Sequence, residues 1–150
     1  MNNIQGWINL YKPQDITSFH VIKKIKNKFN IKKIGHAGTL DPLAEGILPI
    51  AVGKATKLIS YINNDLKIYQ FSIKWGTETS TDDRAGKILF KSKHKPTLKD
   101  INFKLENYLG IIQQVPPRYS AIKINGERAY KLARMQKNFE IKPKHVFVKH

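Results

Sequence analysis

The sequence contains no cysteine, so neither a disulfide framework nor a thiolate-bound metal can form. It has no apolar run near the ~20 residues that a membrane-spanning helix needs. The start of the chain shows neither the basic nor the apolar region of a signal peptide. The five histidines have no ligand-like spacing. These absences predict a cytoplasmic protein with no metal and no membrane partner.

Acidic residues are also scarce: 11 Asp and Glu stand against 27 Lys and Arg, for a formal net charge of +16. Such an excess indicates a polyanionic partner, most simply a nucleic acid. Only four of the basic residues are arginines, however, and the abundant lysine, isoleucine and asparagine also fit an A/T-rich genome. The charge alone leaves both explanations open.

Length and composition fit one globular domain. A chain of 150 residues with 41% hydrophobic and 25% charged residues can bury a core of its own. We find no repeat, low-complexity tract or internal boundary, so residues 1–150 are predicted to be one domain.

Hydrophobic periodicity predicts most of the regular elements. Helices are expected over 18–29, 58–62, 98–109 and 127–137, and strands over 6–11, 47–52, 69–75, 87–90, 111–115 and 146–148. The segment 69–75 alternates most strictly, and it is predicted to be a strand buried on one face. In the first helix, Thr17 or Ser18 is the expected cap, and Val21, Ile22, Ile25 and Phe29 form the apolar stripe.

Residues 35–49 contain three glycines and two prolines around Asp41. Pro42 disfavours helical geometry at Asp41, which is therefore expected on an extended or turning segment. The apolar residues 47–52 follow directly, and they fit a buried strand or a short helix. This stretch predicts a carboxylate held by a stiff loop at the mouth of a core strand.

The same stretch resembles the signature of the bacterial tRNA pseudouridine synthases of the TruB type. Further similarity includes the pair Lys12-Pro13 and the string 53–57, and it extends from Gly6 to about Lys149. The matching signature positions are His36, Gly38, Thr39, Leu40, Asp41, Pro42, Ala44, Gly46 and Leu48.

The resemblance implies an α+β fold with a mixed, largely antiparallel sheet flanked by helices, as part of a pseudouridine synthase catalytic domain. The family's C-terminal RNA-binding domain is absent from residues 1–150. The implied activity is isomerisation of the T-loop uridine of tRNA to pseudouridine, by a cytoplasmic monomer without a cofactor. The reaction needs a nucleophile, a general base and a base flipped out of its stack.

The resemblance also implies a role for individual residues. Asp41 would be the nucleophile, and Tyr69 would stack on the target base and serve as the general base. His36 would enter the space that the flipped nucleotide leaves. The residues expected to bind substrate are His36, Gly38, Thr39, Leu40, Lys57 and Lys12. Without the resemblance, Asp41 reads as a turn residue and Tyr69 as a core residue.

One feature of the family is missing from the sequence. An arginine in a Gly-Thr-Tyr-Ile-Arg-like string pairs with the aspartate in the family, and no such string occurs here. The sequence is therefore predicted to be the front part of a longer protein, or a truncated one. A tRNA-binding or tRNA-folding module without turnover is the alternative function. A glycoside hydrolase ranks third, because it needs a second carboxylate about 5–10 Å away, for which Glu45, Asp82 and Asp83 are the candidates.

Overall fold

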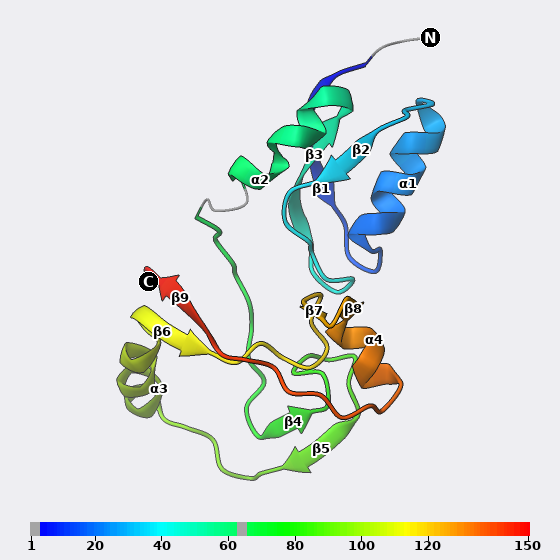
Figure 1. Ribbon diagram of the computed structural model, residues 1–150. Helices are drawn as coiled ribbons and strands as arrows, with labels where there is room; N and C mark the ends of the chain where they lie inside the picture. Colours follow the sequence, from blue (N-terminus) through cyan, green and yellow to red (C-terminus); the bar gives the residue numbers. More distant parts are fainter. Residues whose placement is uncertain (1–3, 63–65) are drawn as a thin grey trace. The chain divides into compact units, whose positions relative to one another are not determined.

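The computed structural model describes residues 4–62 and 66–150 (Figure 1). The sequence predicts no internal boundary, whereas the chain divides into two compact units, Met1–Gln70 and Phe71–His150.

The first unit contains a three-stranded antiparallel sheet in the order β1-β3-β2. Its strands are β1 (Gly6–Lys12), β2 (Ile34–His36) and β3 (Gly46–Val52). The central strand β3 pairs Leu48 with Leu10 of β1 and Ile50 with His36 of β2. The predicted strand 6–11 is confirmed, and residues 47–52 are a strand rather than a helix. Strand β2 was not predicted, since its three residues are too few for a periodic pattern.

Helix α1 (Ser18–Lys28) begins where the sequence predicts, with Thr17 as its cap. The Thr17 side chain accepts a hydrogen bond from the backbone N–H of His20 at 3.1 Å. Val21 belongs to the buried core together with Leu48, Ile50 and Val52 of β3, and Ile25 packs against it. Phe29, predicted for the same stripe, is 52% exposed. The prediction is wrong there because Phe29 lies beyond the last helical residue, where helical periodicity no longer sets its direction.

A 3₁₀ helix, η1 (Gly53–Leu58), and the short helix α2 (Ile59–Ile62) follow β3. Gly53 has φ of +64°, and a Cβ there would lie 2.9 Å from the Ile4 carbonyl oxygen, so only glycine fits this turn. The side chain of Ile59 lies close to Gly35 of β2. A Cβ on Gly35 would be only 2.8 Å from the Cδ1 atom of Ile59. This segment therefore packs against Gly35.

The predicted strand over 69–75 is wrong. Residues 66–74 have no regular secondary structure, and the four alternating side chains are exposed: Tyr69, Phe71, Ile73 and Trp75. A strand needs a neighbour for its N–H and C=O groups. The next strand along the chain that the sequence predicts, β5 (Ile88–Lys91), pairs with β4 (Thr77–Thr79).

The second unit contains three two-stranded antiparallel sheets. Besides β4 and β5, it pairs β6 (Gly110–Gln114) with β9 (Lys144–Val148), and β7 (Lys123–Ile124) with β8 (Glu127–Arg128). Its helices are α3 (Leu98–Leu105), the 3₁₀ helix η2 (Glu106–Tyr108) and α4 (Ala129–Arg134). Helix α4 is shorter than predicted because residues 127–128 pair in a hairpin, whose turn Asn125-Gly126 has φ of 49° and 87°.

The α+β class is confirmed. Within the described ranges every strand pairing is antiparallel, and helices accompany the sheets in both units. No helix among these residues is both long and apolar enough to cross a bilayer.

Candidate active site on the loop between β2 and β3

The signature residues form the end of β2, the start of β3 and the loop between them. The loop is anchored at its base, where the N–H of Ala37 donates to the Pro49 carbonyl at 2.9 Å. Gly38 has φ of +76° and Gly46 has φ of +142°, a region that favours glycine. The two glycines therefore let the chain leave one strand and enter the next, with Asp41 between them.

Asp41 lies on the loop and is exposed. Its backbone carbonyl accepts a hydrogen bond from the N–H of Ala44 at 3.1 Å. In the described part of the chain no hydrogen bond to its carboxylate is found. The position agrees with the prediction of an acidic group on a turning segment directly before a core strand.

The residues on both sides of Asp41 are tied to the rest of the unit. The Ser18 hydroxyl donates to the Leu40 carbonyl at 3.0 Å and accepts from the Leu40 N–H at 3.1 Å. The Pro42 carbonyl accepts from the N–H of Asp15 at 2.7 Å. The sequence predicts Ser18 only as a possible helix cap, because nothing in the spacing links it to a residue 22 positions away.

Lys12 of β1 also holds this loop in place. Its side chain is fully buried, and its ammonium donates to the carbonyls of Pro13 and Ile16, both at 2.8 Å, and of Pro42 at 3.5 Å. Burial lowers the pKa of Lys12, and the negative charges of Asp15, Asp41 and Glu45 oppose that shift. The resemblance assigns Lys12 to substrate binding. In this arrangement its three N–H bonds are used inside the protein, so we interpret it as support for the loop.

His36 ends β2 and is half-buried. Its Nδ1 lies 2.9 Å from the Gly38 carbonyl oxygen. A carbonyl can only accept, so the ring carries its proton on Nδ1 in this bond, which fixes the orientation of the imidazole. The Nε2 atom is then left as the acceptor of the neutral ring. His36 thus lies at the base of the loop that carries Asp41.

The other predicted substrate-binding residues are Gly38, Thr39, Leu40 and Lys57, and they lie in different surroundings. Thr39 is exposed on the loop, and Leu40 packs its side chain against the core. Lys57 is exposed on η1, and its side chain forms no hydrogen bond within the described residues. The side chain of Lys67 lies beside the loop, since its Cε atom would be 3.9 Å from a Cβ on Gly38. The sequence does not predict Lys67 as a site residue.

Tyr69 is 69% exposed and lies on the segment without regular structure. Its ring is therefore available to solvent rather than part of a core. In the described ranges no hydrogen bond joins it to Asp41. The segment comes close to the loop two residues earlier, at Lys67.

Two of the additional carboxylates, those of Glu45 and Asp83, have hydrogen-bond partners. The Tyr11 hydroxyl forms a hydrogen bond with Glu45, which raises the pKa of Tyr11. Asp83 orders its own loop in the second unit. Its carboxylate accepts from the Thr81 hydroxyl at 2.6 Å and from the Ala85 N–H at 2.9 Å. Glu45 and Asp83 are thus engaged in hydrogen bonds of their own.

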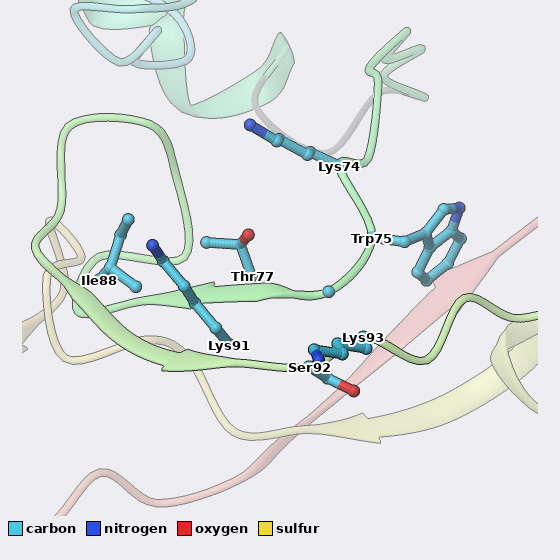
Figure 2. A pocket seen from close by; sticks show the side chains of 8 residues that line it. Lys74, Trp75, Thr77, Ile88, Lys91, Ser92 and Lys93 are labelled. Atoms are coloured by element: carbon cyan, nitrogen blue, oxygen red, sulfur yellow. The ribbon is translucent and has the colours of Figure 1, made fainter.

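A separate cavity lies wholly within the second unit. It measures about 570 Å³ and is lined by three lysines, Lys74, Lys91 and Lys93, together with Trp75 and Thr77. Figure 2 shows Lys74 and Lys91 extending toward the same open space over β4. None of the predicted site residues contributes to it. Within the described residues, no group of three or more His, Asp or Glu side chains could hold a metal ion.

A solvent-facing carboxylate on a loop that is held at the neighbouring residues can act chemically as a nucleophile. The chain belongs to the TruB family. Residues 26–150 match the model of the family described as "TruB family pseudouridylate synthase (N terminal domain)".

Curated relatives are similar over nearly the whole chain. A tRNA pseudouridine synthase B of Wolbachia pipientis subsp. Culex pipiens is 52% identical over 95% of this chain and 40% of its own length. One of Ehrlichia ruminantium is 49% identical over 95% of this chain and 48% of its own length. The chain therefore spans less than half of the length of these relatives.

A solved structure is similar in fold. The crystal structure of a Cbf5-Nop10-Gar1 complex contains a chain that is 30% identical, with a TM-score of 0.53. The similarity covers 79% of this chain and 31% of the other. This agrees with a pseudouridine synthase-like α+β core.

Proposed function

We propose that this protein is an RNA-modifying isomerase that converts the T-loop uridine of tRNA to pseudouridine, with Asp41 as its nucleophile. The observation that carries the proposal is the state of Asp41. Its carboxylate faces solvent without a hydrogen-bond partner in the described part of the chain, while the residues before and after it are held in place. Family membership and the names of the relatives support the same reaction.

The chemistry requires little besides a fixed carboxylate. The bond between the ribose and the ring nitrogen of uracil breaks, and the base is attached again through a ring carbon. No redox change and no net hydrolysis occur, so the reaction needs no redox cofactor and no energy source. A carboxylate can act as nucleophile or electrostatic partner at the sugar or the ring. A general base then removes the proton from the carbon that has been attached.

Tyr69 and His36 would act on the flipped nucleotide and its neighbours. A uridine inside a stacked loop must leave the stack, which costs a few kcal/mol that pocket contacts offset. The exposed ring of Tyr69 can stack on the extruded base, and its phenolate form can accept the carbon-bound proton and become the phenol. The imidazole of His36, fixed by its bond to Gly38, can fill part of the vacated space by stacking on neighbouring bases.

Lysine side chains would supply most of the affinity for tRNA. The net charge is +16, and the lysines of α1 and the following turn are exposed: Lys23, Lys24, Lys26, Lys28, Lys32 and Lys33. Neutralisation of phosphates by such residues releases counterions and provides binding without sequence specificity. We expect a cytoplasmic monomer, in keeping with a soluble RNA substrate.

The test is release of tritium from uridine-labelled tRNA. Label on the ring carbon that forms the new bond is lost as water when pseudouridine forms. The protein is assayed both as the chain of 150 residues and with any continuation that its gene encodes. Tritium release by either form, abolished in Asp41→Asn, supports the proposal. An active Asp41→Asn variant contradicts the role of Asp41, and no release by either form contradicts the activity.

A tRNA-binding or tRNA-folding module without turnover is the second candidate. One observation favours it: the four arginines, at 84, 118, 128 and 134, all lie outside any Gly-Thr-Tyr-Ile-Arg-like string, the string whose arginine pairs with the aspartate in the family. A guanidinium beside the carboxylate would keep it ionised and oriented. Retention of tRNA on a filter without tritium release identifies this function.

A further inference from the structure

We propose that Ser18 is a positioning residue for Asp41, acting through the peptide group that joins Leu40 to Asp41. The inference rests on the proposed function of Asp41 as the nucleophile and adds a residue that holds it. Ser18 touches neither substrate nor reacting atoms in this proposal. Its role is to fix the backbone from which the carboxylate projects.

The hydroxyl of Ser18 forms two hydrogen bonds with one residue. It donates to the Leu40 carbonyl at 3.0 Å and accepts from the Leu40 N–H at 3.1 Å. The Leu40 carbonyl belongs to the planar peptide unit whose nitrogen is that of Asp41. A single side chain therefore fixes the orientation of the plane that enters Asp41.

The plane that leaves Asp41 is fixed as well. The Asp41 carbonyl accepts from the Ala44 N–H at 3.1 Å, inside the same loop. Only two backbone dihedrals separate the two planes. With both planes held, the Cα–Cβ direction of Asp41 is set, and its carboxylate can move only by rotation of the side chain.

Ser18 is suited to this role because it sits on a rigid element and is not used elsewhere. It is the first residue of α1, 2% exposed, and the helix is packed on β3 through Val21 and Ile25. Thr17 caps the helix, so the Ser18 hydroxyl is not needed for capping. A buried hydroxyl without a partner is costly. Here that cost is met by the two bonds to the loop.

Loss of the hydroxyl is expected to affect the chemical step more than binding. Catalysis by a nucleophile depends on its position to within fractions of an ångström, and a displacement of 1 Å can cost about 10²-fold in rate. We expect Ser18→Ala to lower kcat by about 10- to 100-fold, with KM for tRNA changed less than about threefold. Side chains that contact the RNA are unchanged in this variant.

Thr17→Ala is the matched control. It removes the neighbouring hydroxyl, whose bond is to His20 inside α1 and not to the loop. If Ser18 acted only by stabilising the helix, both variants would lose thermal stability and keep kcat. We expect Thr17→Ala to retain kcat within about threefold of the parent, since its loss is confined to the cap.

Amide hydrogen exchange provides a readout that does not depend on turnover. In Ser18→Ala the Leu40 N–H loses its acceptor, and its exchange rate is expected to rise at least about tenfold, while Thr17→Ala leaves it unchanged. The kinetic assay uses the form of the protein that releases tritium in the experiment on the proposed function.

The outcomes separate the two proposals. Faster Leu40 exchange together with a fall in kcat in Ser18→Ala alone supports the role of Ser18. Unchanged exchange, or faster exchange with unchanged kcat, overturns it even when the parent protein is active. If no form releases tritium, the isomerase proposal fails and with it the role in catalysis, whereas the exchange data still decide whether Ser18 holds the loop.

Discussion

The buried ammonium of Lys12 donates to the carbonyl of Pro42, the residue that follows Asp41, at 3.5 Å. The same ammonium donates to the carbonyls of Pro13 and Ile16. The strand β1 is thereby linked to the loop between β2 and β3 by one cation. This cation also attracts the negative charge of Asp41.

Lys12→Met is expected to lower the free energy of unfolding of the first unit by about 2 kcal/mol, because three carbonyls lose a charged donor. Urea unfolding measures this through the fluorescence of Trp7, in a Trp75→Phe background that silences the second unit. The exposed Lys26→Met serves as the control and should change stability by less than about 0.5 kcal/mol. Equal stability of the two variants would show that the Lys12 bonds contribute nothing.

Asp41→Asn is expected to abolish pseudouridine formation while binding of tRNA stays within about threefold of the parent. The amide keeps the size of the side chain and loses the charge and nucleophilicity. Tritium release and filter binding, measured on the same preparation, separate the two effects. Comparable loss of binding would instead indicate that Asp41 contributes to RNA affinity.

Tyr69→Phe keeps the ring that can stack on a base and removes the oxygen that, as phenolate, can accept a proton. We expect it to lower kcat by about 10²-fold or more, the usual size of a general-base contribution, with little change in KM. Tyr61→Phe, at another exposed tyrosine of the first unit, should be silent. Full activity of the Tyr69 variant would limit this residue to stacking or packing.

Affinity for tRNA is expected to fall steeply with salt if the exposed lysines of α1 neutralise phosphates. The slope of log K against log salt changes by about 0.7 to 0.9 for each phosphate contact. Replacing Lys23 and Lys24 by glutamine should make the slope shallower, whereas the same positions as arginine should preserve it. A flat salt response in the parent would favour genome composition as the origin of the charge.

The stabilisation that Asp100 gives to the N-terminus of α3 is expected to be lost at low pH. The Asp100 carboxylate accepts from the Thr97 hydroxyl at 2.7 Å and from the Thr97 N–H at 3.0 Å, which lowers the pKa of Asp100 from 3.8. Because the folded pKa lies below the unfolded one, the contribution to stability is complete above the unfolded value and is lost as the pH falls through the folded value.

Urea unfolding followed by Trp75 in a Trp7→Phe background tests the acid dependence. The difference in stability between the parent and Asp100→Asn should be present at pH 6 and shrink as the pH is lowered below about 4. A difference that stays constant across this range would show that the charge of Asp100 is not involved.

The sequence determined the features that local chemistry controls. Pro42 and the flanking glycines predicted a turning loop at Asp41, and the apolar run after it predicted the start of a core strand. The cap at Thr17 was also predicted, because it depends on side chains within a few residues of one another.

Only the tertiary structure decided which distant groups meet. Ser18 reaches Leu40 and Lys12 reaches Pro42 across 22 and 30 positions, and no periodicity encodes such pairs. The same reason explains the error at residues 69–75, where alternation favours a strand but a strand forms only if a neighbour accepts its hydrogen bonds. Local propensity is a property of the sequence, whereas hydrogen-bond partners far along the chain are supplied by folding.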